Sequence, residues 1–311
     1  MARTKGSKNV TTLIAEGLLP PSAKGWSKKD RQDYMDQQLN PDPRDSMTDK
    51  EILDELRGRF DVFARLVRAS AHGMVNSVII SGSAGISKTY TAEKILEHEE
   101  MTRGIRRKLI KGTISPIDLY EAAYNMRNES DILMLDDADR IFADEEGLNI
   151  LKALLDTSDN RQVSWMTDHP RFKGDSALPK SFQYNGSIIF ITNRNFYAEI
   201  ERGASKYIEH MKALLDRSIY IDLKIHDRRT VALWVTHIVT LHRILQGMGL
   251  SAQMEQDGLK WLRENVEDVR ELSIRTVVKM GKMMLMSQSK NKDITVDWRE
   301  MASLAFLKNR G

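Results

Sequence analysis

The feature that most constrains the fold of this chain is a short segment of small residues between an apolar run and a helical pattern. Residues 78–80 are Val-Ile-Ile, residues 81–87 are Ser-Gly-Ser-Ala-Gly-Ile-Ser, and Lys88 and Thr89 open the helical pattern. A strand, a loop and a helix in this order place backbone N–H groups and a helix N-terminus where they favour phosphate oxygens. We therefore expect a phosphate site here, and a structural turn of the same composition is the alternative.

The segment follows the P-loop pattern G-x-x-x-x-G-K-[ST] with one departure. Lys88 would reach the β- and γ-phosphates of ATP, and the hydroxyl of Thr89 would bind Mg²⁺. Ser87 stands where the second glycine is expected; serine can start a helix and brings a hydroxyl near the phosphates, but it adopts a positive φ less readily than glycine. The expected nucleotide contacts in this segment are Gly82, Ser83, Ala84, Gly85, Ile86, Ser87, Lys88, Thr89 and Tyr90.

Composition limits the class of protein. The chain has 311 residues, of which 41% are hydrophobic and 29% charged, and this balance is typical of a globular protein with a substantial core. The net charge of +3 gives no overall nucleic-acid signature, although local basic patches remain possible. The absence of cysteine excludes disulfides, thiolate metal sites and cysteine nucleophiles. No apolar run reaches the length of a membrane span and no secretory segment opens the chain, so we expect a cytoplasmic protein.

Three regions follow one another along the chain. Residues 1–45 are rich in lysine and proline, and we expect a flexible basic arm that either docks on nucleic acid or a protein partner or is only a solvated tail. In residues 46–224 strands alternate with helices, which predicts a parallel sheet covered by helices on both faces. Residues 225–311 contain only helical patterns and are expected to form a helical domain. The expected strands are 77–81, 103–110, 131–136, 187–192 and 218–223; the main expected helices are 48–73, 88–100, 116–124, 148–155, 231–245, 254–266, 273–286 and 296–307.

Polar side chains follow two of the apolar strands. Asp136 and Asp137 follow Ile132–Leu135, and Asn193 follows the strand 187–192. We expect Asp136 to hold Mg²⁺, Asp137 to polarise the attacking water, and Asn193 to contact the γ-phosphate or that water. The alternatives are that the aspartates cap a turn and that the asparagine begins one.

Two arginines are candidates for phosphate contacts. Arg217 precedes the last strand and could reach a neighbouring subunit's γ-phosphate, although most single arginines are simply surface residues. Arg275 lies two residues after the helix cap Ser273, where a cation opposes the helix dipole. That conflict indicates an anionic partner, either the nucleotide or a nearby carboxylate such as Glu271 or Asp268.

Five motifs resemble those of the AAA+ ATPases in their order and spacing, over roughly residues 46–311. They are the P-loop at residues 82–89, the pair Asp136 and Asp137, Asn193, Arg217 and Arg275. The resemblance implies an α/β core with a five-stranded parallel sheet, a helical lid, ATP and Mg²⁺ as ligands, and a homo-oligomeric ring or spiral, commonly of six subunits. It also implies that Arg217 completes the neighbour's site. The compact chain is similar in style to ATPases encoded by tailed phages, for which the cytoplasm would be that of the host. Asp137 stands where glutamate is usual, so hydrolysis could be slow.

The substrate of such an ATPase has to be sought in local features. A basic cluster spans residues 103–111 and precedes a segment similar to the pore loop of AAA+ proteins, without the aromatic residue of peptide-gripping loops. We expect nucleic-acid contacts at Arg107, Lys108, Lys111 and Thr113. The segment 161–186 is expected to form a hairpin or loop, anchored by Trp165 and Phe182, that adds basic and aromatic residues. DNA remodelling or translocation in replication or recombination is the main hypothesis; a protein-remodelling ATPase of the MoxR kind and a slowly hydrolysing nucleotide switch are the alternatives.

Overall fold

The computed structural model describes residues 10–15, 19–25, 27, 31, 43–158, 160–174, 177–203, 207–291 and 293–308. By its internal contacts the chain divides into two compact units, Met1–Ile52 and Leu53–Gly311. The domain boundaries expected at residues 45/46 and 224/225 stay predictions. No helix in the described ranges combines the length and the apolar character that a bilayer span needs.

The first unit contains little regular structure among its described residues. It has the helix α1 (Val10–Ala15) and two 3₁₀ turns, η1 (Pro21–Gly25) and η2 (Pro43–Ser46). Within it Leu19 and Ala23 are buried, and the Arg31 guanidinium donates to the carbonyl of Ala23 at 3.2 Å. Most of the expected flexible arm, including Lys5, Lys8, Lys28 and Lys29, lies outside the described residues.

The long helix α3 (Asp49–Ala71) begins in the first unit at the expected capping box. The backbone N–H of Thr48 donates to the Glu51 carboxylate at 2.8 Å, and the N–H of Glu51 donates to the Thr48 hydroxyl at 3.3 Å. These two bonds satisfy backbone donors that have no partner within the helix.

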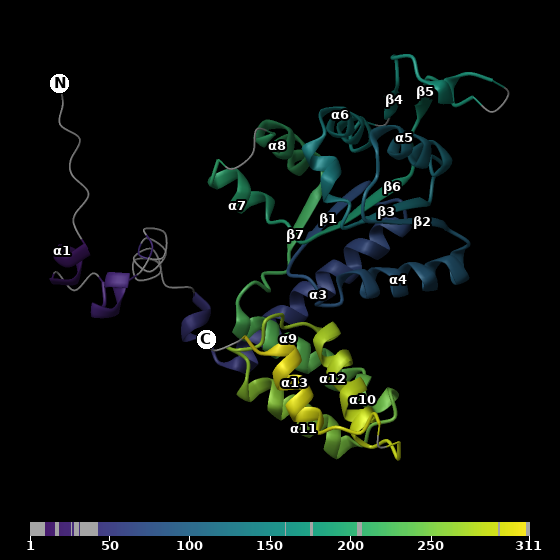
Figure 1. Cartoon of the computed structure of the whole chain (residues 1–311). Coiled ribbons are helices and arrows are strands. Elements are labelled where there is room, and N and C mark those ends of the chain that lie inside the picture. Colours follow the sequence, from purple (N-terminus) through teal and green to yellow (C-terminus); the bar gives the residue numbers. More distant parts are fainter. Residues whose placement is uncertain are drawn as a thin grey trace. The chain divides into compact units, whose positions relative to one another are not determined.

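A five-stranded parallel sheet forms the centre of the second unit, and it confirms the predicted fold class (Figure 1). Its strand order is β2-β3-β6-β1-β7, so only β2 and β3 of the neighbouring strands in this described sheet follow one another in sequence. All residues of β1, β3 and β6 are buried, which explains their continuous apolar runs. The strands are β1 (Ser77–Ser81), β2 (Arg106–Lys111), β3 (Asp131–Asp136), β6 (Ser187–Thr192) and β7 (Ile219–Asp222).

The register of this sheet aligns the ends of the central strands. Ser81 of β1 pairs with Thr192 of β6, and Asp136 of β3 pairs with Ile191. The carboxyl ends of β1, β3 and β6 therefore lie at one edge, where ligands bind in open α/β sheets. The residues that follow these three strands are the ones expected to form a nucleotide site.

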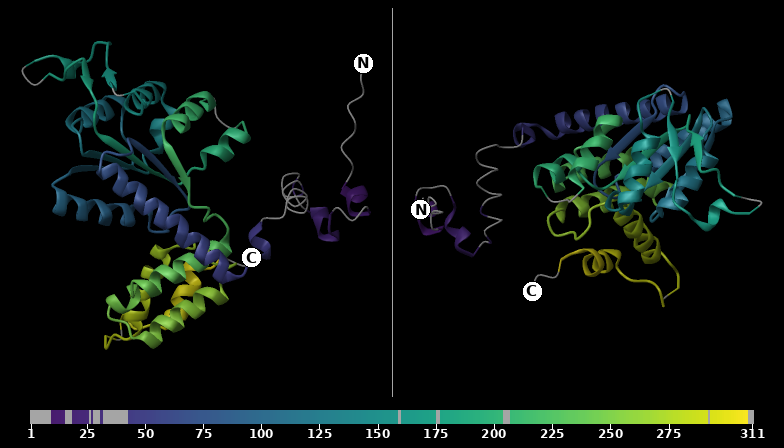
Figure 2. Two further views of the ribbon diagram at one scale, coloured as in Figure 1. Left: turned by 180° about the vertical axis from the view of Figure 1, so that it is seen from behind. Right: turned by 90° about the horizontal axis from the view of Figure 1, so that it is seen from above.

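Helices cover both faces of the sheet, as Figures 1 and 2 show. On one side are α3 and α4 (Lys88–Arg103), and on the other are α5 (Pro116–Asn125) and α6 (Glu145–Leu154). The short helices η3 (Asp139–Ala143), α7 (Phe196–Glu201) and α8 (Ile208–Arg217) complete this part. Helix α4 is three residues longer than expected because Gly104, at φ +68°, caps it and donates to the carbonyl of Glu100. Strand β2 consequently starts at Arg106 instead of residue 103.

An antiparallel hairpin occupies the expected position between α6 and β6. It consists of β4 (Gln162–Ser164), the turn η4 (Pro170–Phe172) and β5 (Ser181–Gln183). Trp165 and Phe182 are buried, and the Tyr120 ring of α5 meets both edge-on. The prediction that these two residues anchor the hairpin in the core is confirmed.

The remainder of the second unit is helical, as predicted. Its helices are α9 (Arg228–Leu241), α10 (Ile244–Gly247), α11 (Ala252–Glu264), α12 (Ile274–Ser287) and α13 (Trp298–Phe306). The single helix expected over 231–245 is divided, because Arg243 adopts a left-handed conformation with φ +48° between α9 and α10.

Candidate functional site

The segment between β1 and α4 has the geometry of a phosphate-binding loop. Residues 82–87 connect the end of the strand at Ser81 to the start of the helix at Lys88. Two residues of this loop have positive φ, Gly85 at +71° and Ser87 at +75°. Ser87 thus adopts the left-handed conformation for which glycine was expected. Its hydroxyl makes no capping hydrogen bond to α4.

Lys88 is the buried cation at the centre of the site. Its side chain is only 5% exposed, and Nζ donates to the carbonyls of Gly82 at 2.6 Å and Ser83 at 2.8 Å and to Oδ1 of Asn193 at 2.8 Å. Burial lowers the pKa of Lys88 to about 8, against the opposing effect of the nearby aspartates. The anionic oxygens of a bound phosphate would favour the charged form.

Thr89 and Asp136 form the pair expected to bind Mg²⁺. The Thr89 hydroxyl lies 2.9 and 3.0 Å from the two carboxylate oxygens of Asp136. Burial raises the pKa of Asp136, and the charge of Asp137 adds to this effect. Within the described ranges no group of three or more His, Cys, Asp or Glu side chains could hold a metal ion by itself. Mg²⁺ commonly takes one or two carboxylates and completes its shell with water and substrate phosphates, so the Thr89–Asp136 pair fits this ion.

A chain of hydrogen bonds links the P-loop lysine to the second aspartate. Asn193 accepts from Lys88 through Oδ1 and donates through Nδ2 to Oδ1 of Asp137 at 2.8 Å. Asp137 has φ +53°, and its N–H donates to the carbonyl of Ile191 at 3.0 Å. Unusual backbone angles at a non-glycine residue concentrate at functional sites. The structure thus brings together three of the predicted site residues, Lys88 from the start of α4 and Asp137 and Asn193 from the ends of β3 and β6.

The C-terminal helical segment contacts the P-loop directly. The indole N–H of Trp234 on α9 donates to the carbonyl of Ile86 at 3.0 Å. The N–H of Ile274 at the start of α12 donates to the carbonyl of Gly85 at 3.0 Å. A change in the loop on nucleotide binding would therefore reach two helices of this segment.

The two candidate arginines differ in their positions. Arg275 is close enough to Lys88 for its charge to contribute, after burial, to the lowered pKa of that lysine. It makes no hydrogen bond or ion pair with a described residue, and so none with Glu271 or Asp268. Arg217, at the end of α8, donates to the carbonyl of Ala213 at 2.9 Å and lies 4.0 Å from Asp156. No described contact joins Arg217 to the P-loop of its own chain.

Comparisons with known proteins identify a relative in sequence and a solved structure with the same fold. An uncharacterized 36.7 kDa protein of Enterobacteria phage T4 is 33% identical over 254 residues, which are 82% of this chain and 75% of the T4 protein. Domain III of the replication initiation protein DnaA from Thermotoga maritima shares the fold, with a TM-score of 0.50 and 15% identity over 80% of this chain and 92% of that domain. The chain belongs to the family of this T4 protein, and its fold is that of the AAA+ ATPases. No protein-family model matches it.

The basic cluster of residues 103–111 is divided between the two faces of the edge strand β2. Arg107 faces α4, where it pairs with Glu100 at 2.7 Å and with Glu97 at 3.8 Å. Lys111, four residues later and on the same face, lies 3.4 Å from Glu93 of α4. Lys108 points to the opposite face, because successive side chains of a strand alternate. The four expected nucleic-acid contacts therefore do not form one patch.

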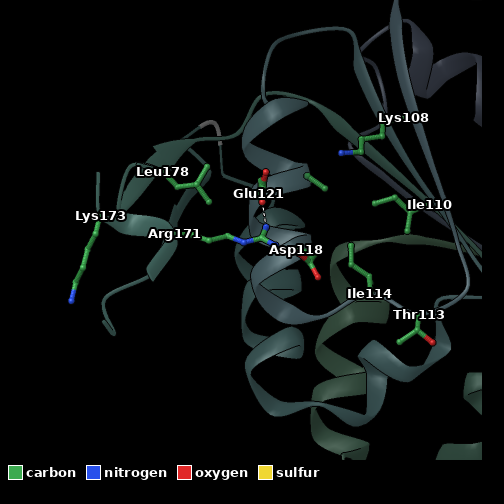
Figure 3. Close-up of a pocket in the computed structure, with 10 residues that line it drawn as sticks. Lys108, Ile110, Thr113, Ile114, Asp118, Glu121, Arg171, Lys173 and Leu178 are labelled. Atoms are coloured by element: carbon green, nitrogen blue, oxygen red, sulfur yellow. Dashed lines mark ion pairs between the residues drawn. The ribbon is translucent and has the colours of Figure 1, made fainter. Parts of the chain in front are cut away.

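Lys108 and Thr113 line a cavity of about 640 Å³ beside α5 and the hairpin (Figure 3). Arg171 of η4 crosses this cavity to α5, where it pairs with Asp118 at 2.7 Å and also with Glu121. Lys173 lines the cavity as well and points away from α5 in Figure 3. The ion pairs of Arg171 hold the hairpin against α5 and leave Lys108 as a separate positive charge.

Several site residues were not predicted. Asp139 accepts from the Thr192 hydroxyl at 2.7 Å, and burial raises its pKa. A third aspartate two residues after Asp137 was a visible signal for it. No local sequence pattern indicated that Trp234 bonds to the P-loop or that Ser273 lies close to Gly85. Both contacts depend on how α9 and α12 pack against the loop.

Proposed function

We propose that this protein is a Mg²⁺-dependent AAA+ ATPase that couples ATP binding and hydrolysis between subunits to the remodelling or translocation of nucleic acid. The observation that carries the ATPase assignment is the hydrogen-bonded chain from Lys88 through Asn193 to Asp137, beside the Thr89–Asp136 pair. In this proposal the chain links the lysine that binds phosphate to the aspartate that positions the attacking water, and the pair that binds the metal lies next to it.

Each residue then has a role that its position supports. Lys88 leaves the two loop carbonyls and binds the β- and γ-phosphates, and Thr89 with Asp136 holds Mg²⁺, which neutralises phosphate charge when bound. Asp137 orients and polarises the attacking water, and Asn193 holds the Asp137 carboxylate in place. Arg275 approaches the nucleotide from α12. Arg217 acts on the site of the next subunit in a ring or spiral, for which six subunits are the expectation.

Nucleic acid is the proposed substrate on two grounds. The fold is shared with a domain of a replication initiation protein. In the cavity that Thr113 also lines, Lys108 and Lys173 have no ion pair among the described contacts, whereas Asp118 and Glu121 of the same cavity are paired with Arg171. Arg107 and Lys111 are balanced by carboxylates of α4, so Lys108 becomes the leading phosphate contact. The basic N-terminal arm would add a second contact, to nucleic acid or to a protein partner.

The test is the ATPase rate at fixed low salt, measured without DNA and with single- or double-stranded DNA. Stimulation that fades as the salt concentration rises supports a DNA-directed ATPase. Turnover indifferent to DNA favours protein remodelling, and nucleotide binding without turnover favours a switch. Lys88→Ala is the control for contaminating ATPase, since it removes the phosphate-binding cation.

A matched pair on one strand tests the DNA surface. Lys108→Ala should weaken DNA binding and lower the slope of log affinity against log salt by about one unit per lost phosphate contact. Arg107→Ala removes a charge of the same sign one residue away, on the face where it is already paired. Equal effects of the two substitutions on DNA binding would contradict a DNA contact in the cavity that Lys108 lines.

A further inference from the structure

The indole of Trp234 reaches the P-loop from α9 and is held there by packing. Trp234 is only 3% exposed, and its Nε1–H donates at 3.0 Å to the carbonyl of Ile86, a fully buried residue. The ring of Phe60 on α3 stacks on the indole, with 4.0 Å between the ring centroids and 24° between the ring planes. Burial and the stacked ring therefore leave the indole little freedom to turn its N–H away from the loop.

This hydrogen bond fixes one peptide group of the loop. Ile86 lies between Gly85 and Ser87, which both have positive φ, and its carbonyl has no other donor among the described hydrogen bonds. In a trans peptide the C=O and the N–H point in opposite directions. A carbonyl turned toward Trp234 thus turns the N–H of Ser87 away from it, and that N–H has no acceptor among the described contacts.

We propose that Trp234 is a positioning residue of the nucleotide site, which holds the Ile86–Ser87 peptide in the orientation that binds phosphate. This inference rests on the proposed ATPase function and adds to it a residue of the C-terminal helical segment. Without the indole N–H the buried carbonyl would lack a partner, and the peptide would turn to find one. Nucleotide binding would then have to turn the peptide back, and this cost lowers the affinity.

Phe60 supports the same peptide from one step further away. Its ring sets the plane of the indole and thereby the direction of the indole N–H. No described hydrogen bond joins α3 to residues 82–87, so the ring acts on the loop through Trp234. Substitutions at Phe60 and Trp234 should therefore affect nucleotide binding as a unit.

Equilibrium binding of a fluorescent ADP analogue with Mg²⁺ to the full-length chain tests this inference. Trp234→Phe keeps an aromatic ring against Phe60 and removes the N–H, and it should bind about two- to tenfold more weakly than the parent, as expected for one neutral hydrogen bond. Trp261→Phe is the matched control on α11. It makes the same change at a buried tryptophan that has no described contact with the P-loop, and it should bind with parental affinity.

Inorganic pyrophosphate, used with Mg²⁺ to displace the analogue, separates the phosphate loop from the base. Its affinity should fall in Trp234→Phe by the same factor, because it carries phosphates and no base. A loss confined to the ADP analogue would mean that Trp234 contacts the base, and it would overturn the inference.

Two further comparisons separate positioning from stability. Phe60→Leu should weaken binding in the parent and add no further loss in Trp234→Phe, whereas fully additive losses would contradict action through the indole. A purely structural role would lower the melting temperature of Trp234→Phe without nucleotide and leave its affinity, measured well below that temperature, at the parental value. That result would overturn the inference, and the proposed function would stand if Lys88→Ala still abolished binding. Absence of binding in the parent protein would overturn both.

Discussion

Replacing Gly85 by alanine should loosen the contact between the P-loop and the start of α12. Gly85 has φ +71°, and a Cβ atom built on it would lie 2.5 Å from Cβ of Ser273. That Ser273 atom is attached to the backbone and cannot turn away by a change of rotamer. The loop and the helix start must therefore move apart, which strains the hydrogen bond from the Ile274 N–H to the Gly85 carbonyl.

The size of the effect follows from a comparison with Gly104. That residue has a similar φ of +68°, and a Cβ atom there would have nothing within 4 Å. Alanine at either position costs about 1–2 kcal/mol for the left-handed conformation. Only Gly85→Ala also carries the cost of the overlap, about 1–3 kcal/mol by analogy with overpacked cores. At about 2–4 °C per kcal/mol, Gly85→Ala should melt about 4–8 °C below Gly104→Ala for an overlap cost of about 2 kcal/mol.

Thermal unfolding of the nucleotide-free proteins measures this difference, and a double-mutant cycle with Ser273→Gly assigns it. Ser273→Gly removes the atom that the methyl group added in Gly85→Ala would meet, so part of the loss should be recovered in the double variant beyond simple additivity. The cycle also accounts for the cap that Ser273 provides, since its hydroxyl accepts from the Thr276 N–H at 3.2 Å. Equal melting temperatures for Gly85→Ala and Gly104→Ala would refute the docking of α12 on the loop.

Three further predictions concern the charged groups of the site. The pKa of Lys88 is lowered from 10.5 to about 8, so between these pH values the unfolded chain holds a proton that the folded protein has released, and this group should make stability rise with pH. The free energy of unfolding, measured by urea denaturation from pH 8 to 10, should show this rise in the parent, and Lys88→Met should lack it. Identical pH profiles of the two proteins would contradict the burial of Lys88. Asp137→Asn should fold normally, because asparagine tolerates the φ of +53° and can still accept a hydrogen bond from Asn193. It should still bind ATP, but its turnover, measured by phosphate release, should be at least about tenfold slower than that of the parent. Turnover at the parental rate would remove Asp137 from the chemistry. Arg217→Ala should lose turnover alone but regain it when mixed with Lys88→Ala subunits, which keep the arginine; failure of every mixture to recover activity would rule out action on the neighbouring subunit.

Much of the fold could be predicted because its determinants are local. The buried strands are continuous apolar runs, and the capping box at Thr48 and the proline at the start of α5 mark helix ends. Parallel strands must end at a common edge, so the residues after β1, β3 and β6 could be expected to meet. The errors in the predicted element boundaries were local as well. Strand β2 begins later than predicted because α4 continues to the cap at Gly104, and a predicted helix is divided at Arg243. Both residues adopt a left-handed conformation, which hydrophobic periodicity does not encode.

The amino-acid sequence by itself determined which residues could bind phosphate and metal, since this depends on residue type and on spacing along single elements. Only the tertiary structure decided which of them are available. Alternation on β2 and the carboxylates of α4 separate Arg107 from Lys108, and the docking of α9 and α12 brings Trp234 and Ser273 to the P-loop. These contacts join residues between about 7 and 188 positions apart in the chain. Such pairings depend on how whole helices pack against the sheet and the loop, and no local pattern of apolar and polar residues records that packing.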